Sequence, residues 1–219
     1  MADWPTIASL ATAGGTLVLA AATFSSVRFG QRSTRIAERS TSIAERALLL
    51  GLRPVLAPAR VTDPPEVVRF GEGRMVSVEG GMAAVEREGQ NYYLVIPLRN
   101  VGSGLAVLQA WRFMARRPEA DTPHAPLDEH RPQLRDLYVP AGDTGYWQGA
   151  IRDPDDPFRK GLDEAYDAGE VLAVDLVYGD HEGGQLTITR FILSREEDGS
   201  WRPAVVRHWA LEGVDPRWR

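Results

Sequence analysis

The sequence predicts a mainly β protein in which a long N-terminal helix precedes an antiparallel β-sandwich with one short inserted helix. Three observations support this fold class. No residue from Trp4 to Val27 is charged, although the 219-residue chain carries 25 basic and 30 acidic side chains. A heptad pattern that is typical of a helix continues from there to about residue 51. Beyond Pro54, short apolar runs alternate with glycine-rich turns, as in antiparallel sheets.

The uncharged stretch is long enough for one membrane crossing, so we expect residues 1–27 to form a transmembrane helix. About 24 helical residues span roughly 36 Å, whereas the hydrocarbon core of a bilayer is about 30 Å thick. A cleaved secretory signal is one alternative, but Asp3 stands where a signal peptide needs basic residues. A buried helix of a soluble protein is the other alternative.

The charges that flank this stretch predict its orientation. Arginines follow it, whereas the acidic Asp3 precedes it. By the positive-inside rule, the later residues stay on the cytoplasmic side of the cell membrane, which gives a single-pass protein with a cytoplasmic domain. Residues 28–52 then form a basic amphipathic stalk helix near anionic membrane lipid. The residues predicted to anchor the chain and to face lipid are Trp4, Leu10, Leu17, Val18, Arg28, Arg32, Arg35 and Arg39.

A short repeat extends the helical pattern out of the uncharged stretch. Thr34-Arg-Ile-Ala-Glu-Arg returns seven positions later as Thr41-Ser-Ile-Ala-Glu-Arg, and seven is the coiled-coil period. The same register gives one seam along the helix, and its small residues allow close helix contacts in lipid. We therefore expect self-association or packing on a partner's helix; the alternative is a stalk that rests on lipid or on its own domain. The seam consists of Ala8, Thr12, Gly15, Leu19, Ile36, Ile43 and Leu50.

Residues 53–219 are expected to form the β-sandwich domain. Gly51 and Pro54 end the helix, because glycine has a poor helix propensity and proline lacks an N–H donor. Asp156 is expected to cap a short helix over 159–168, which Gly169 stops. The expected strands are 54–61, 66–70, 75–79, 83–87, 92–100, 105–115, 134–139, 145–152, 171–178, 185–194 and 203–211.

Two segments resemble a known class of module. Tyr92-Tyr-Leu-Val-Ile-Pro-Leu-Arg-Asn-Val-Gly-Ser-Gly-Leu-Ala106 is similar to the strand, Asn-x-Gly turn and strand of bacterial immunoglobulin-like modules of the adhesion and CARDB-like kind. Val174-Asp-Leu-Val-Tyr-Gly-Asp-His-Glu-Gly183 resembles the closing strand and hairpin of similar membrane-anchored proteins from GC-rich, actinobacterial-like genomes. The resemblance implies an Ig-like sandwich and carries over no catalytic or ligand residues.

The search for chemistry gives one weak candidate. The sequence holds no cysteine, no G-x-S-x-G elbow, no H-E-x-x-H motif and no phosphate-binding loop, so we predict no catalytic, cofactor-binding or metal-binding residues and no cofactor. Asp180, His181 and Glu182 form a possible loop site in a glycine-flanked hairpin whose composition is first that of a turn. The acidic sandwich makes nucleic acid an improbable partner.

These features predict a membrane-anchored, non-enzymatic interaction or accessory module. An alternative is a membrane-tethered hydrolase or small-ligand-binding protein that uses Asp180 and His181, and another is an extracellular adhesion or cell-wall module if the topology is inverted. The expected partners are membrane lipid and a protein, or a second copy through the N-terminal helix. The proline-rich loop 116–133 is the best candidate for a variable contact surface, and plain disorder is its alternative. The tryptophans are expected in the core, with a carbohydrate platform as the alternative.

Overall fold

The computed structural model describes residues 4–119, 121–182 and 185–211. It divides into two compact units, Met1–Leu50 and Gly51–Arg219, which are treated separately below. Within the first unit, the described side chains are those at positions 14–17, 19, 22–26, 28, 31, 34–45, 47 and 48.

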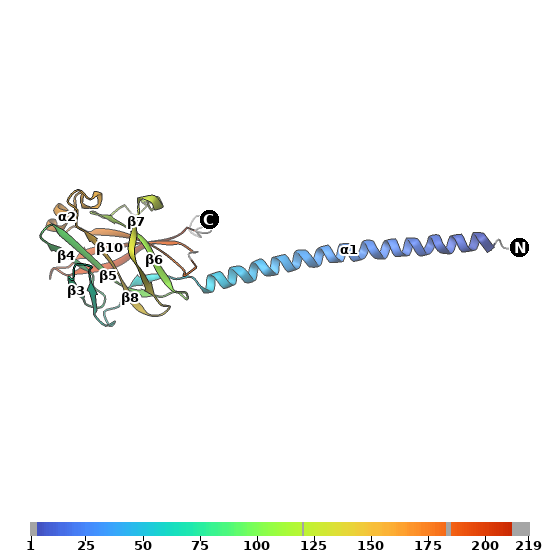
Figure 1. Ribbon diagram of the computed structural model, residues 1–219, viewed down its shortest axis with the longest axis horizontal. Helices are drawn as coiled ribbons and strands as arrows, with labels where there is room; N and C mark the ends of the chain where they lie inside the picture. Colours follow the sequence, from blue (N-terminus) through green and yellow to red (C-terminus); the bar gives the residue numbers. More distant parts are fainter. Residues whose placement is uncertain (1–3, 120, 183–184, 212–219) are drawn as a thin grey trace. The chain divides into compact units, whose positions relative to one another are not determined.

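The first unit consists of helix α1 (Trp4–Gly51), which Figure 1 shows as one continuous coil. Its hydroxyl side chains bond to carbonyls one turn earlier, as Thr23 does to Leu19 at 2.8 Å and Ser26 to Ala22 at 2.9 Å. Such bonds to the carbonyl one turn earlier are the usual arrangement of Ser and Thr hydroxyls inside a helix. In the described part of the chain, no helix is both long enough and apolar enough to cross a membrane.

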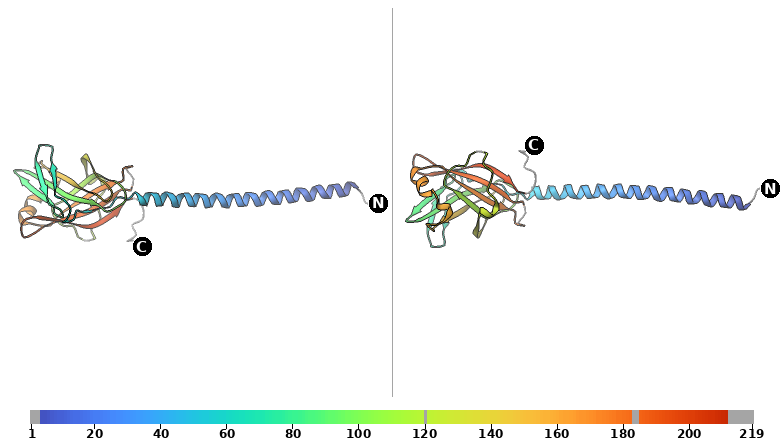
Figure 2. Two further views of the ribbon diagram at one scale, coloured as in Figure 1. Left: turned by 90° about the horizontal axis from the view of Figure 1, so that it is seen from below. Right: turned by 90° about the horizontal axis from the view of Figure 1, so that it is seen from above.

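The second unit is built from two antiparallel sheets that face each other, as the views in Figure 1 and Figure 2 show. This confirms the mainly β, sandwich-like fold. The first sheet holds β1 (Leu56–Pro58), β4 (Ala84–Glu88), β5 (Asn91–Asn100) and β8 (Thr144–Ile151). The second has the order β11 (Trp201–Ala210), β10 (Thr187–Arg195), β9 (Leu172–Gly179), β6 (Ala106–Met114) and β7 (Arg131–Val139). A hairpin of β2 (Glu66–Arg69) and β3 (Met75–Val78) packs on the outer face of the first sheet.

Strand β5 is the centre of the first sheet. Its residues from Tyr92 to Leu98 are buried, because the second sheet covers one face and the β2–β3 hairpin covers the other. One edge of β5 pairs with β4 and β1 in succession, and the other edge pairs with β8. Strand β8 therefore lies at the rim of this sheet.

Among the described residues, the backbone joins the two sheets on one side. At the β4 side, the Ala83 N–H donates to the Trp201 carbonyl at 2.7 Å, which forms a bridge between the sheets. At the other side, β7 and β8 are the outer strands, and within the described residues β8 pairs with β5 alone. This second side depends on side chains.

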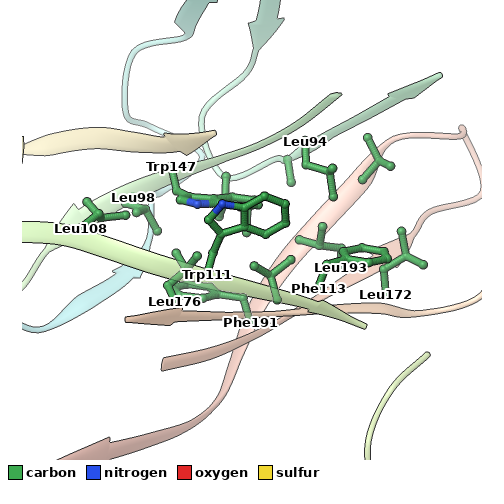
Figure 3. Packing of buried hydrophobic residues seen from close by; sticks show 14 of the residues in the cluster. Leu94, Leu98, Leu108, Trp111, Phe113, Trp147, Leu172, Leu176, Phe191 and Leu193 are labelled. Atoms are coloured by element: carbon green, nitrogen blue, oxygen red, sulfur yellow. The ribbon is translucent and has the colours of Figure 1, made fainter. Parts of the chain in front are cut away.

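Two tryptophans supply much of that contact. Trp147 of β8 and Trp111 of β6 meet edge to face, with ring centroids 5.3 Å apart, in the centre of the core shown in Figure 3. Both side chains are buried, as are those of Trp201 and Trp209. The prediction that the tryptophans belong to the sandwich core is thereby confirmed for Trp111, Trp147 and Trp201. Trp209 instead lies in a separate small cluster with Val177 and Ile188.

The indole ring of Trp147 folds along its own strand over Gly149. A Cβ atom added at Gly149 would lie 2.6 and 2.7 Å from two carbon atoms of that ring. Glycine is therefore required two residues after Trp147, because both positions face the core and the large ring uses the space of the smaller one.

The short inserted helix differs from its prediction over 159–168. The structure has a 3-10 turn η2 (Pro157–Arg159) and then helix α2 (Leu162–Ala168). Asp156 accepts from the Phe158 N–H and caps the turn instead of the helix. Gly161, at φ 75°, interrupts the predicted helix because the left-handed backbone cannot continue an α-helix. Gly169 ends α2 as predicted.

We predict that Gly149→Ala lowers the free energy of unfolding by about 1–3 kcal/mol, because the added methyl group forces the Trp147 ring off its position. Urea denaturation of the full chain in detergent, followed by tryptophan fluorescence, measures this loss. Gly71→Ala is the matched control, since a Cβ there meets nothing within 4 Å. Equal stability of the two variants would contradict the packing described for Trp147.

Candidate functional site

The predicted loop site at Asp180, His181 and Glu182 is built as a turn. Asp180 is buried, and its carboxylate accepts from the Glu182 N–H at 3.1 Å. The side chains of His181 and Glu182 are exposed. Among the described residues, no group of three His, Cys, Asp or Glu side chains is placed to hold a metal ion.

The proline-rich loop between β6 and β7 is tied to the second sheet by a buried ion pair. Arg190 of β10 and Asp175 of β9 are direct cross-strand neighbours, joined by two 2.7 Å hydrogen bonds. Arg190 also donates to the Thr122 carbonyl at 3.0 Å and to the Pro123 carbonyl at 3.3 Å. The guanidinium thus anchors the middle of the loop to the sheet.

Both loop histidines take part in this anchoring. The His124 ring meets the Trp209 ring at 5.5 Å, and Arg190 lies 4.8 Å from the centroid of the same Trp209 ring. His130 is buried, its Nδ1 lies 2.9 Å from the Pro126 carbonyl, and its burial lowers its pKa. A 3-10 turn η1 (Leu127–Glu129) precedes it. Thr122, Pro123 and His124 are therefore held against the sheet, and His130 is buried.

The strongest surface feature begins in β7, where the pairing with β6 is interrupted. Leu108 of β6 pairs with Leu137, but the next paired positions are Ala110 and Pro132. Residues 133–136 stand opposite Gln109 alone and form an irregular bulge of four residues, larger than the usual two-against-one bulge. Within this bulge, the Leu134 side chain is 94% exposed. Bulges of this kind redirect side chains away from the sheet.

Strand β8 faces this bulge with an unpaired backbone edge. The Gln148 carbonyl accepts from the Gln133 side-chain amide at 3.2 Å, so it points away from β5. The opposite strand agrees: Pro97 stands across from Tyr146, and its carbonyl accepts from the Ala59 N–H and therefore points away from β8. Because backbone direction alternates along an antiparallel strand, Tyr146, Gln148 and Ala150 all direct N–H and C=O outward.

A groove of about 630 Å³ lies between the bulge, the outer edge of β8 and the turn of the β2–β3 hairpin. We call it the β7–β8 groove. Its volume is within the range of about 300–1,000 Å³ that is typical of ligand sites. It is lined by Phe70, Gly71, Glu72, Trp111, Arg131, Gln133, Leu134, Arg135, Gln148, Gly149, Ala150, Arg152, Asp153 and Asp156.

Two of the three groove arginines are bound to carboxylates. Arg131 forms two 2.6 Å bonds to Asp156 and lies 5.0 Å from the centroid of the Trp111 ring. Arg152 binds both carboxylate oxygens of Glu72, and this hydrogen bonding lowers the pKa of Glu72 to about 2. These pairs stiffen the two ends of the groove and cancel their charge at neutral pH.

The third guanidinium, that of Arg135, binds uncharged oxygens. It donates to the Tyr146 hydroxyl at 3.1 Å and to the Gln148 side-chain oxygen at 2.9 Å. Within the described residues, no carboxylate lies within ion-pair distance of it. The groove thus combines an exposed apolar side chain, an unpaired strand edge and a cation that can accept an acidic ligand.

The predicted helix seam can be placed only in part. Leu19, Ile36 and Ile43 are about two-thirds exposed on α1, and Gly15 is exposed as well. Leu17, Arg28, Arg35 and Arg39 of the predicted anchor are also exposed. The side chains of Trp4, Ala8, Leu10, Thr12, Val18, Arg32 and Leu50 lie outside the described residues.

Sequence reasoning missed the β7–β8 groove. The strand predicted over 134–139 corresponds to β7, but β7 begins earlier, at Arg131, and contains the bulge in its middle. Trp147 followed by Gly149 is the one local signal of a tight core position beside the groove. No sequence pattern indicates that β8 is a rim strand, because this depends on how β5 is paired.

We predict that Asp175→Asn lowers the free energy of unfolding by about 3–5 kcal/mol, because it leaves the buried Arg190 charge uncompensated. The variant should also release the loop, so trypsin should cleave it faster after the exposed Arg116. Urea denaturation and limited trypsin digestion measure the two effects.

The matched control is Glu196→Gln, which breaks the exposed ion pair of Glu196 with Arg202 and should cost about 0–1 kcal/mol. Trypsin resistance of the Asp175→Asn loop would show that the ion pair does not hold it.

Comparison with protein-family models, with curated proteins and with solved structures found no match. The similarity to immunoglobulin-like bacterial modules therefore remains a prediction from residues 92–106 and 174–183.

Proposed function

We propose that the protein is a non-enzymatic interaction module, whose sandwich binds a protein partner while the N-terminal helix holds it at a membrane. The β7–β8 groove is the observation that carries this proposal. It presents the highly exposed Leu134 beside Arg135 and the free edge of β8. Exposed apolar and arginine side chains around a hollow are typical of protein interfaces.

The membrane part of the proposal rests on the sequence alone, since no helix in the described part of the chain is both long enough and apolar enough to cross a membrane. The uncharged stretch from Trp4 to Val27 and the arginines after it favour a single-pass anchor with the sandwich on the cytoplasmic side. Within the Ig-like class that the strand and turn pattern favours, such a domain would act as an accessory subunit of a membrane assembly. An inverted topology would make it an extracellular module.

Self-association through α1 is a second candidate, and the exposure of the seam favours it. Ile36 and Ile43 are apolar, share one heptad register and are exposed in a single chain. Both follow the proposed membrane anchor, where a helix contact would bury them and burial of apolar surface favours association in water. The soluble part of the seam is short, so the membrane half would have to contribute.

Photo-crosslinking in native membranes tests the interaction. With p-benzoylphenylalanine in place of Leu134, we expect a specific adduct with another protein. Val61 is the matched control, because it is also apolar and highly exposed but lies outside the groove. The same probe at Ile43 reports on the helix, where an adduct of twice the chain mass would support self-association.

Equal adducts from positions 134 and 61, or none from either, would contradict the groove as the partner surface. If the probe at Ile43 gives no adduct of twice the chain mass, the seam is not a site of self-association. The two results are independent, since they concern different units.

Single cysteines in this cysteine-free chain test the location. We expect Ala2→Cys to react with an impermeant maleimide in intact cells, and Ser103→Cys to react only after the cells are opened. Ser103 is exposed, so burial would not protect it. Strong labelling of position 103 in intact cells would place the sandwich outside.

A further inference from the structure

The outer edge of β8 is a preformed template for one more strand. We propose that the β7–β8 groove binds an extended, acidic segment of a protein partner, which adds to β8 as a strand and places a carboxylate on Arg135. This inference rests on the proposed function and names the chemistry of the partner. Such β-augmentation takes affinity from main-chain hydrogen bonds and specificity from side chains.

The backbone supports the strand pairing. Tyr146, Gln148 and Ala150 direct their N–H and C=O groups away from β5, into the groove side of β8. Three outward positions fit a segment of about five residues, or roughly 17 Å at about 3.4 Å per residue. A sheet rim with unpaired groups in a row is the usual template for pairing with another chain.

The side chain of Gln133 already occupies one hydrogen-bonding position that an added strand would use. Its side-chain amide donates to the Gln148 carbonyl, as a backbone N–H of a neighbouring strand would. The other end of this amide, Oε1, is buried without a hydrogen-bond partner in the described structure. An incoming N–H can therefore replace Gln133 at low cost, since the side chain leaves a half-satisfied position.

The β7 bulge explains why the space is open. A regular β7 would continue its pairing with β6 between Leu108 and Ala110, but residues 133–136 leave that ladder. They contribute Leu134 and Arg135 to the groove wall opposite β8. The bulge thus separates the two rim strands and supplies the side chains that would meet a ligand.

The groove lining holds three arginines and three carboxylates, Asp153 included, so charge favours an acidic group only beside Arg135. Arg131 and Arg152 are already neutralised by Asp156 and Glu72, whereas Arg135 contacts only uncharged oxygens in the described part of the chain. A carboxylate can form a charge-assisted pair with Arg135 that a neutral or basic segment cannot. Beside it, Leu134 offers an apolar contact for a neighbouring side chain of the segment.

Fluorescent peptides and the full chain in detergent provide the test. The probes are seven-residue peptides of alternating Val and Thr, with one Glu moved through each position, and the same set with Lys. We expect Glu peptides to bind and Lys peptides to bind at least about tenfold more weakly, since a charge-assisted bond is lost. Arg135→Gln should reduce this preference, whereas Arg202→Gln, at an exposed arginine outside the groove, should not.

N-methylation of the best peptide tests the strand pairing itself. Methyl groups on the alternate amides that face β8 should abolish binding, while methyl groups on the other set should leave it within about threefold. Binding that resists both sets, a lack of binding by all peptides, or equal binding of Glu and Lys peptides would overturn the inference.

The crosslinking result separates the two proposals. A specific adduct from position 134 together with failure of the peptides keeps the interaction module and removes the added strand. Failure of both removes the groove as a partner surface. An adduct from position 134 to a second copy of this chain overturns the inference, because the edge then pairs within a dimer.

Discussion

The packing of Trp147 against Trp111 across Gly149 is the constraint on which the second side of the sandwich depends. The backbone bridge from Ala83 to Trp201 closes the first side, and backbone pairing does not extend to β7 and β8 within the described residues. The two indole rings therefore join the rim strand β8 to β6, the strand that pairs with β7. This arrangement allows a strand edge to remain open in a domain whose core is otherwise tightly packed.

The open edge is also protected against unwanted pairing. Gln133 covers one carbonyl of β8, the bulge twists β7 away, and charged side chains stand at both ends of the groove. Natural sheets use these devices to prevent aggregation at their edges. In this groove the Arg135 guanidinium has no carboxylate partner among the described residues. A strand that carries a carboxylate can therefore bind at an edge where other strands are disfavoured.

Much of the fold follows from sequence patterns, and the groove does not. Alternation and turns located the strands to within a few residues, because each depends on neighbours along the chain. The bulge in β7 arises from its register with β6. Leu108 pairs with Leu137, but Ala110 pairs with Pro132, where a regular register would place Arg135. The burial of His130 likewise arises only in the folded domain, and the break at Gly161 depends on a left-handed backbone that glycine permits but does not require. The identity of the partner surface is thus a tertiary property.

The Arg190 anchor changes the behaviour of the loop from 115 to 130 in another respect. Because Arg190 holds Thr122 and Pro123, the loop consists of two short segments, 115–121 and 124–130, instead of one long segment. The entropy of closing a loop rises only slowly with its length, by about 0.6 kcal/mol for each doubling. Each half can therefore gain or lose residues on its own without moving the other. The half before Thr122 is in effect an insertion site, because the anchor separates residues added there from the β7 side of the groove.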